Sequence, residues 1–341
     1  MYRILNVSNS PAPRYGLVLL LVAFGSQAAF CKEKFAAFDP PGSIRTFPVG
    51  INDTGTISGW YYDSNSVVHG FVRAADGTIT SFDPAGSTGT FAYGLNREGV
   101  IAGYYADGNA INHGFVRATD GTITSFDPAG STNTIVYDNN NKGAVTGYYA
   151  DSSGTIHGFV RTAHGVFTSF DPPGSTETEA SGINAAGAVT GFYIDGDDVS
   201  HGFVRTASGA YTIFDISGST AIYPFLINSK GAIAGTYYVN NTYPQRGFVR
   251  AADGTITTID PSGSIFNYAF GINNEGVITG DYADGSDVVH SYKRSTDGSI
   301  TSFDPPGATS SFAYGINDKG SIAGLFSLPN DPDWHGYVRS K

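Results

Sequence analysis

The chain has 341 residues, of which 45 are glycine and only 14% are charged, and this composition favours short strands and turns over helices. Its 23 Phe and 21 Tyr residues favour β-strands as well. The formal net charge of −11 does not favour binding to the negatively charged backbone of a nucleic acid. We therefore expect no nucleic-acid partner, and cationic or hydroxyl-rich ligands fit the charge better.

Residues 1–28 have the layout of a secretory signal peptide. Two arginines precede an apolar run over residues 15–24, and small residues follow it. The apolar run is too short to cross a membrane. We expect cleavage after Ala28 or Ala29, a secreted or periplasmic location, and no membrane span. Cys31 is the only cysteine, so no disulfide can form within the chain.

From residue 34 to residue 341, one pattern of about 44 residues is repeated seven times. Each copy contains the same short motifs, which in the first copy are Phe-Asp-Pro-Pro-Gly (38–42), Gly-Ile-Asn (50–52), His-Gly-Phe-Val-Arg (69–73) and Asp-Gly-Thr-Ile-Thr (76–80). One asparagine recurs at intervals of 44 residues, except for one interval of 45: Asn52, Asn96, Asn140, Asn184, Asn228, Asn273 and Asn317. No linker separates the copies, so we expect a single domain.

Each copy predicts four short strands in the same order. In the first copy the first strand ends at residues 50–52, and the others cover residues 55–61, 69–73 and 77–83. Glycine-containing turns between them are typical of hairpins. The Pro-Pro-Gly or Pro-Ala-Gly after the fourth strand cannot continue a ladder, so it predicts a crossover to the next copy. Apolar residues fall on both faces of the third strand, which indicates a sheet packed between two neighbours.

These numbers predict an all-β fold, a single seven-bladed β-propeller with four-stranded antiparallel blades. The segment over residues 35–39 corresponds to a fourth strand without a sheet of its own. The segment over residues 335–339 corresponds to a third strand that lacks a fourth. We therefore expect the first segment to complete the last blade and close the ring, which leaves no exposed edge.

A histidine recurs at the start of the third strand, 14 residues before the aspartate of the following Phe-Asp-Pro motif. In a hairpin the two residues would lie opposite each other. The predicted pairs are His69–Asp83, His113–Asp127, His157–Asp171, His201–Asp215, Arg246–Asp260, His290–Asp304 and, between the two chain ends, His335–Asp39. Because every copy has the pair, we interpret it as structural rather than catalytic, and we expect it to raise the histidine pKa.

The Gly-Ile-Asn-x-x-Gly segment followed by His-Gly-Phe resembles the bacterial HAF-type extracellular repeats, which are named for His-Ala-Phe. The likeness covers residues 34–341, with Gly70 at the place of the alanine. The resemblance implies export and a propeller-like repeat. It implies no established activity and no catalytic residues.

We expect function where one copy departs from the repeated pattern. Five residues before the repeated asparagine, the fourth copy carries Glu179 where the others carry Phe, Ile or Tyr, and Glu177 lies on the same face. Asp138 replaces the usual glycine two residues before the asparagine of the third copy. At the mouth of a channel these carboxylates would bind a cation or a sugar, or act as acid and base. The alternatives are solvated loop charges and, for Asp138, a turn cap.

Three further departures lie in the last two copies. Lys293 replaces a valine of the third strand and Asp281 an apolar residue of the second, and these two would pair with each other or face solvent. Trp334, in the loop before the last strand, would stack on a sugar ring or pack against the protein. We predict no metal and no cofactor, with calcium at the acidic loop over residues 195–198 as the alternative.

The sequence contains no nucleophile elbow, phosphate loop, zinc motif or dinucleotide fingerprint. We therefore predict a monomeric, non-catalytic module that binds a glycan or a protein. The alternative is a carbohydrate-active enzyme, a polysaccharide lyase or glycoside hydrolase, and a structural envelope protein is a third interpretation. A cluster of Glu177, Glu179 and Asp138 with a perturbed carboxylate would favour the enzyme. A flat aromatic rim without this cluster would favour binding.

Overall fold

The computed structural model describes residues 34–239 and 242–340, so the predicted signal peptide over residues 1–28 lies outside the described residues. All regular secondary structure in the described part of the chain is β-strand. Within these residues, no helix is long and apolar enough to cross a membrane. The fold is therefore all-β.

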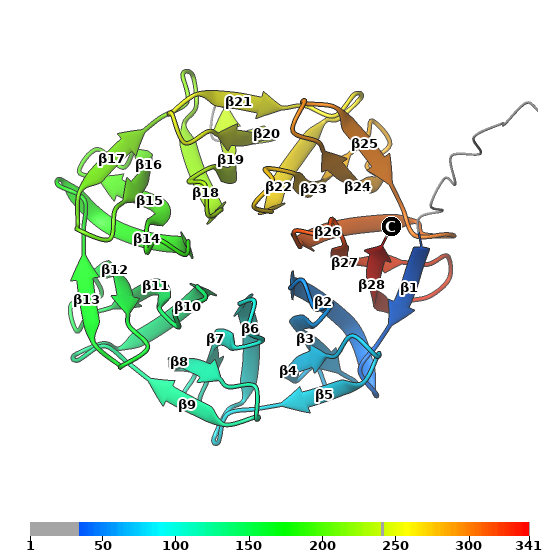
Figure 1. Ribbon diagram of the computed structural model, residues 1–341, viewed down its shortest axis with the longest axis horizontal. Helices are drawn as coiled ribbons and strands as arrows, with labels where there is room; N and C mark the ends of the chain where they lie inside the picture. The colour runs from blue at the N-terminus through cyan, green and yellow to red at the C-terminus, as the bar shows by residue number, and fades with distance from the viewer. Residues whose placement is uncertain (1–33, 240–241, 341) are drawn as a thin grey trace, which may run out of the picture. The chain divides into compact units, whose positions relative to one another are not determined.

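The strands occupy four equivalent positions in the successive sequence copies (Figure 1). The first strands are β2 (Ser43–Ile51), β6 (Gly89–Leu95), β10 (Asn133–Asn139), β14 (Ser175–Ile183), β18 (Ala221–Ile227), β22 (Phe266–Ile272) and β26 (Ser310–Ile316). The second strands are β3 (Ile57–Asp63), β7 (Ile101–Ala106), β11 (Val145–Ala150), β15 (Val189–Asp195), β19 (Ile233–Val239), β23 (Ile278–Ala283) and β27 (Ile322–Ser327).

The third and fourth strands follow in the same order. The third strands are β4 (Val68–Arg73), β8 (Asn112–Arg117), β12 (Ile156–Arg161), β16 (Ser200–Arg205), β20 (Thr242–Arg250), β24 (Val289–Arg294) and β28 (Trp334–Ser340). The fourth strands are β5 (Ile79–Phe82), β9 (Ile123–Phe126), β13 (Phe167–Phe170), β17 (Tyr211–Phe214), β21 (Ile256–Ile259), β25 (Ile300–Phe303) and β1 (Lys34–Phe38). The first strands lie nearest the centre of Figure 1 and the fourth strands farthest from it.

Within each copy the strands pair antiparallel in sequence order, which gives four-stranded sheets. In the last sheet the fourth place is taken by β1, which pairs antiparallel with β28 from Lys34 opposite Ser340 to Phe38 opposite Gly336. Short parallel bridges join β2 to β28, β4 to β6, and β12 to β14. Other neighbouring sheets have no such bridge, so the backbone ladders do not form one continuous closed sheet.

The core lies between adjacent sheets. One aromatic side chain of each third strand is fully buried, with 0% exposure: Phe71, Phe115, Phe159, Phe203, Phe248, Tyr292 and Tyr337. Burial of one such side chain stabilises the fold by about 1.5–3 kcal/mol. Phe38, at the end of β1, packs in one cluster with Phe71 of the first copy and Ala323 of the last. The two ends of the described chain therefore share a hydrophobic core.

The turn after each repeated asparagine requires a glycine. In the first copy Gly55 donates its amide hydrogen to the carbonyl oxygen of Asn52 at 3.0 Å and adopts a φ angle of 86°. This left-handed conformation is unfavourable for residues with a Cβ atom. The recurrent Asn-x-x-Gly spacing follows from this geometry.

The pairing of β1 with β28 can be tested by cross-linking. In a variant with Cys31→Ser, Ala36→Cys and Val338→Cys, we expect an intramolecular disulfide after mild oxidation, because Ala36 and Val338 are register partners. Facing residues of antiparallel strands have Cβ atoms about 4.5–5.5 Å apart, within the reach of a disulfide. The measurement is the mobility of oxidised and reduced protein in denaturing electrophoresis.

The matched control places the first cysteine one residue later, at Ala37, while Val338→Cys is kept. Ala37 faces Tyr337 and points to the opposite side of the sheet. Cross-linking as efficient in this control as in the Ala36 variant, or none in the Ala36 variant, would contradict the observed register.

Candidate functional site

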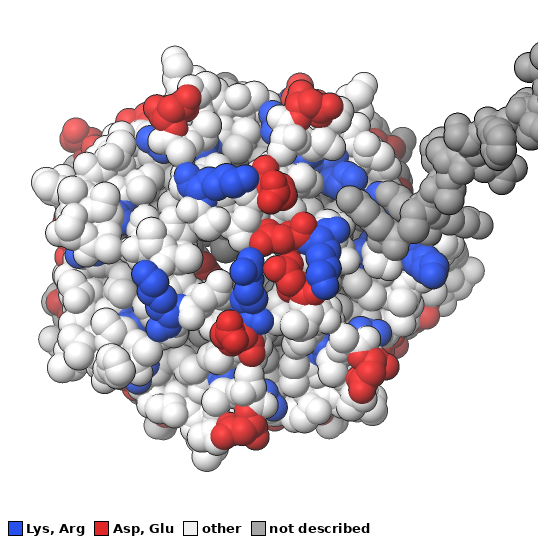
Figure 2. Space-filling view, in the orientation of Figure 1, with Lys and Arg blue, Asp and Glu red and all other residues white. Residues whose placement is uncertain are grey.

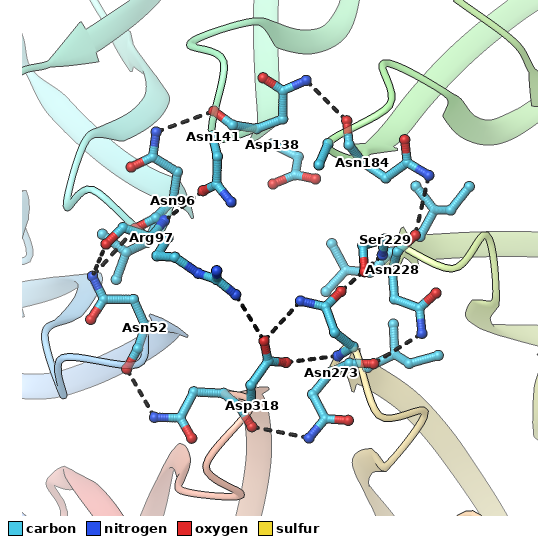
Figure 3. A pocket seen from close by; sticks show the side chains of 18 of the residues that line it. Asn52, Asn96, Arg97, Asp138, Asn141, Asn184, Asn228, Ser229, Asn273 and Asp318 are labelled. Carbon is cyan, nitrogen blue, oxygen red and sulfur yellow. Dashed lines mark hydrogen bonds and ion pairs between the residues drawn. The ribbon is translucent and has the colours of Figure 1, made fainter.

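Seven buried asparagine side chains form a closed ring of hydrogen bonds, which we call the asparagine ring (Figure 3). In each copy the asparagine Nδ2 donates to the backbone carbonyl oxygen of the asparagine in the next copy, over 2.9–3.3 Å. The donors, in chain order, are Asn52, Asn96, Asn140, Asn184, Asn228, Asn273 and Asn317. The bond from Asn317 to the carbonyl oxygen of Asn52 closes the ring. The Oδ1 atom caps the turn of its own copy, as Asn52 does for the amides of Thr54 and Thr56 at 3.1 Å.

Charged side chains bridge the opening of the asparagine ring. The guanidinium of Arg97 lies 3.1 Å from Asp318 and 3.5 Å from Asp53, so it connects the second copy with the seventh and the first. Asn274 Nδ2 donates to Asp318 Oδ2 at 2.9 Å. Figure 3 shows Arg97 extending across the opening toward Asp318. On the face seen in Figure 2, acidic and basic side chains lie side by side around the centre.

Two cavities follow one another along the inside of the first strands. The smaller cavity, of about 220 Å³, is lined by the asparagine ring. The larger cavity, of about 990 Å³, is lined by residues of the first and second strands. Six residues line both cavities and form what we call the collar: Ile51, Leu95, Asp138, Leu226, Ile272 and Ile316. The larger cavity is therefore bounded at one end by a mainly aliphatic collar.

Every first strand has a β-bulge at the same place, three residues before the ring asparagine. In the second copy, for example, the register with β7 passes from Ala92 to Gly94 and leaves Tyr93 without a cross-strand partner. A bulge of this kind turns one side chain away from the regular alternation of the strand. The skipped residue lines the larger cavity in every copy: Val49, Tyr93, Tyr137, Ser181, Phe225, Phe270 and Tyr314.

Aromatic side chains dominate the wall of the larger cavity. We call the following set the aromatic belt: Phe47, Trp60, Tyr93, Tyr137, Phe192, Tyr223, Phe225, Phe270 and Tyr314. Its members contact one another, with ring centroids 5.7 Å apart for Phe47 and Trp60 and 4.7 Å apart for Trp60 and Tyr93. Burial raises the pKa of Tyr93 and Tyr137 above the ordinary value, so both hydroxyls stay protonated at neutral pH.

Glu177 and Glu179 project from β14 into the larger cavity. They face Ile194 and Phe192 of β15, and their separation by two residues puts them on one side of the strand. Glu177 is exposed and Glu179 half-buried. Burial, and then the charge of Glu177, raises the pKa of Glu179 to about 7. Within the described residues, neither carboxylate has a hydrogen bond or ion pair to another side chain or to the backbone.

Asp138 lies in β10 at the collar, where it lines both cavities. Its Oδ1 accepts a hydrogen bond from the amide of Asn139 and its Oδ2 one from the amide of Ile183 in β14, both at 2.8 Å. Burial raises the pKa of Asp138 to about 7, although both amides lower it. In the preceding copy a Cβ at Gly94 would lie only 2.8 Å from the Asn139 amide nitrogen. At Asp138 the carboxylate instead accepts a hydrogen bond from the next first strand.

The other three predicted site residues do not line either cavity. The prediction that Asp281 faces solvent is wrong: its side chain is 1% exposed, and burial raises its pKa well above the ordinary value. Lys293 lies in β24 opposite Thr279. Trp334 is not in a loop but begins β28, and its ring packs against Phe312 at 5.4 Å. The structure therefore brings together Asp138, Glu177 and Glu179, and places the others elsewhere.

The predicted histidine–aspartate pairs are all present, with histidine Nδ1 2.7–2.8 Å from an aspartate oxygen. In the fifth copy Arg246 lies 3.6 Å from Asp260. A second aspartate lies 3.2–3.8 Å from each histidine Nε2: Asp63, Asp107, Asp151, Asp195, Asp284 and Asp331. Our prediction missed it, although in five copies it stands six residues before the histidine.

Three of these pairs shift the pKa of their histidine in the direction expected. Burial lowers the pKa of His157, His201 and His335, but hydrogen bonds to the paired aspartates outweigh burial, and the pKa of each is raised. None of the pairs lines either cavity. Their position fits a structural role.

The acidic loop over residues 195–198 does not gather ligands for calcium. Asp195 Oδ1 accepts hydrogen bonds from the amides of Asp197 and Val199 at 2.9 Å, and its Oδ2 lies 3.2 Å from His201. Across residues 34–239 and 242–340, no group of three or more His, Cys, Asp or Glu side chains is placed to hold a metal ion.

Comparison with protein-family models gives no match, and comparison with curated proteins gives none. Among solved structures the chain is similar to puromycin hydrolase, with a TM-score of 0.60 and 13% identity over 86% of this chain and 53% of that one. The chain thus spans about half the length of that protein. It is also similar to the lectin of Aleuria aurantia described as a six-bladed β-propeller (TM-score 0.45, 14% identity, 81% and 97% covered) and to TolB from Acinetobacter baumannii (0.45, 11%, 80% and 76%).

Identities this low concern the fold alone and bring no function to the chain. The fold is propeller-like, since four-stranded antiparallel sheets surround a centre lined by their first strands. Membership of the HAF-type repeats stays a prediction.

The raised pKa of Glu179 predicts how stability depends on pH. The pKa of Glu179 in the folded protein is about 7, so its proton is held up to about that pH, whereas the unfolded chain releases it near the ordinary glutamate pKa of 4.5. The contribution to stability is therefore complete below the unfolded pKa and is lost as the pH rises to about 7. Glu179→Gln should leave the free energy of unfolding unchanged at about pH 4 and raise it by about 3 kcal/mol at about pH 8.

Urea denaturation at the two pH values measures this difference. The control is Glu98→Gln, because Glu98 is exposed and lines neither cavity. An equal effect of Glu179→Gln at both pH values would show that burial of the charge is not its cause.

Proposed function

We propose that the protein is a closed seven-bladed β-propeller that binds a glycan in the larger cavity without catalysing a reaction. Two observations support the closed ring. The asparagine ring runs through all seven copies, and its last bond returns from Asn317 to Asn52. β1 pairs with β28 and completes the last four-stranded sheet.

The observation that carries the binding proposal is the aromatic wall of the larger cavity. Its volume of about 990 Å³ suits a small molecule or the end of an oligosaccharide. Trp60 and the tyrosines of the aromatic belt offer flat apolar faces, against which the C–H face of a sugar ring packs. Glu177, Glu179, the Ser181 hydroxyl and the tyrosine hydroxyls supply the hydrogen-bond partners that sugar hydroxyls need.

The charge of the cavity narrows the class of glycan. The described residues that line it include Asp138, Glu177 and Glu179 but no lysine, arginine or histidine. A polyanionic glycan such as a polyuronate would bring more negative charge into a cavity that offers no cation to balance it. A neutral or cationic glycan meets no such cost.

We further propose that the protein acts outside the cytoplasm as a monomer. The predicted signal peptide supports export. The completed last sheet supports the monomer, because it leaves no fourth-strand place open for another chain.

The second candidate function is a carbohydrate-active enzyme, and the raised pKa of Glu179 and of Asp138 to about 7 favours it. The placement of the carboxylates argues for binding instead. Glycosidases place two carboxylates on either side of the scissile bond. Glu177 and Glu179 share one side of one strand, and both oxygens of Asp138 are held by backbone amides.

Trp60→Ala tests the binding proposal. We expect wild-type protein to bind members of a glycan array and Trp60→Ala to lose at least about tenfold in affinity for them, because a stacked aromatic face contributes about 1 kcal/mol beyond its buried area. The matched control is Trp334→Ala, since Trp334 lines neither cavity. Thermal denaturation checks that both variants fold. Equal losses in the two variants, or no glycan bound by the wild type, would refute the proposal.

Incubation with the bound glycans distinguishes the two candidate functions. We expect no new reducing ends and no unsaturated products, with wild-type protein or with Glu179→Gln. If the wild type cleaves a bound glycan and Glu179→Gln does not, the protein is the carbohydrate-active enzyme and not the binding module, because Glu179 would then be the acid or base.

A further inference from the structure

The carboxylates of the larger cavity lie on two neighbouring strands, whereas aromatic residues line the cavity on many strands. Glu177 and Glu179 project from β14, and Asp138 from the neighbouring β10. Phe47 of β2 and Tyr314 of β26 line the same cavity from across the ring, as Figure 1 shows for their strands. A ligand that fills the cavity therefore meets aromatic rings on several sides and carboxylates on one side only.

Glu179 is a carboxylate without a partner at a half-buried position. Within the described residues it has no hydrogen bond and no ion pair, although it leaves water in part on folding. Burial of an unpaired carboxylate is unfavourable. A cation bound beside Glu179 would therefore offset part of the cost of burying its charge. Phe192 is the register partner of Glu179 on β15 and lines the same cavity.

Aromatic residues line the larger cavity together with Glu179: Tyr137 of β10, Tyr223 of β18, and Phe192, its register partner on β15. After burial and, for Tyr137, the neighbouring Tyr148, the charge of Glu179 also contributes to raising the pKa of Tyr137 and of Tyr148. The pKa of Tyr223 is raised mainly by burial, with a smaller part from Glu179. An ammonium group bound to Glu179 would lie beside several aromatic rings, whose faces attract cations.

Building on the proposed glycan-binding function, we infer that the larger cavity selects glycans that carry a free amino group, with the ammonium held by Glu179 and Glu177 and a sugar ring packed on the aromatic belt. Neutral glycans pack on the aromatic belt and hydrogen-bond to the carboxylates, but they bring no positive charge to them. N-acetylated sugars carry an amide in place of the ammonium and therefore bind the carboxylates weakly. Asp138 has a different role, because its oxygens are already bound by Asn139 and Ile183.

The test compares two tetrasaccharides that share one backbone and differ in charge: the glucosamine tetramer and the N-acetylglucosamine tetramer. Isothermal titration calorimetry is done at about pH 7, where the Glu179 carboxyl of the empty cavity is about half ionised and a bound ammonium favours its charged form. We expect the glucosamine tetramer to bind the wild type about tenfold more tightly or better, since a hydrogen bond to a charged group contributes about 1.5–3 kcal/mol. The preference should decrease with added salt.

Variants locate the source of the preference. Glu179→Gln should reduce it to about one by weakening only the glucosamine tetramer, and Glu177→Gln should reduce it in part. Glu98→Gln, on the exposed surface, should leave it unchanged, which separates the cavity from general attraction to a protein of net charge −11. Trp60→Ala should weaken both tetramers.

Each outcome has one meaning. Equal binding of both tetramers, lost in Trp60→Ala, would overturn the amino-group selectivity and leave the proposed glycan binding standing. A preference that persists in Glu179→Gln would overturn the assignment to this carboxylate. No binding of either tetramer would overturn the selectivity, and an array without hits would overturn the proposed function as well.

Discussion

The fold depends on one repeated hydrogen bond, from the side-chain amide of each ring asparagine to a main-chain carbonyl of the next copy. The backbone ladders join only some neighbouring sheets, whereas these bonds join all of them. The same side chain also caps the turn of its own copy through Oδ1, as in Asn228. An unsatisfied buried polar group costs about 1–3 kcal/mol. Each copy is thus stable only beside its successor, which explains why this asparagine occurs in every copy.

The smaller cavity is lined mainly by amides and charged groups, and the larger cavity by aromatic rings and carboxylates. This difference follows from the position of each residue along its first strand. Positions at the turn carry amides and the Arg97–Asp318 bridge, which hold the copies together. Positions nearer the start of the first strand carry aromatic rings and the free carboxylates Glu177 and Glu179. Scaffold and candidate site are therefore separated along each first strand, with the collar between them.

Much of this arrangement can be predicted from the sequence. The repeated motifs predict four strands in each copy. The 14-residue spacing predicts the pairing of His69 with Asp83, because residues equally distant from the turn of a hairpin lie opposite each other. The cavity position of Glu179 follows from its departure from the repeat. The bulges cannot be found by counting, because regular alternation assigns Tyr93 to the wrong face. The burial of Asp281 depends on packing between copies, which no local pattern encodes.

The bulges have a consequence for how such a protein changes over generations. A residue skipped by the ladder, such as Val49 or Tyr93, can be exchanged without altering any cross-strand pair, whereas Ser181 at the same place donates a hydrogen bond to the Pro224 carbonyl oxygen. Seven positions of this kind face one cavity, each in a separate repeat of about the same length. Duplicated genes can therefore acquire new ligands by point mutation at these sites, while selection for folding acts on other codons.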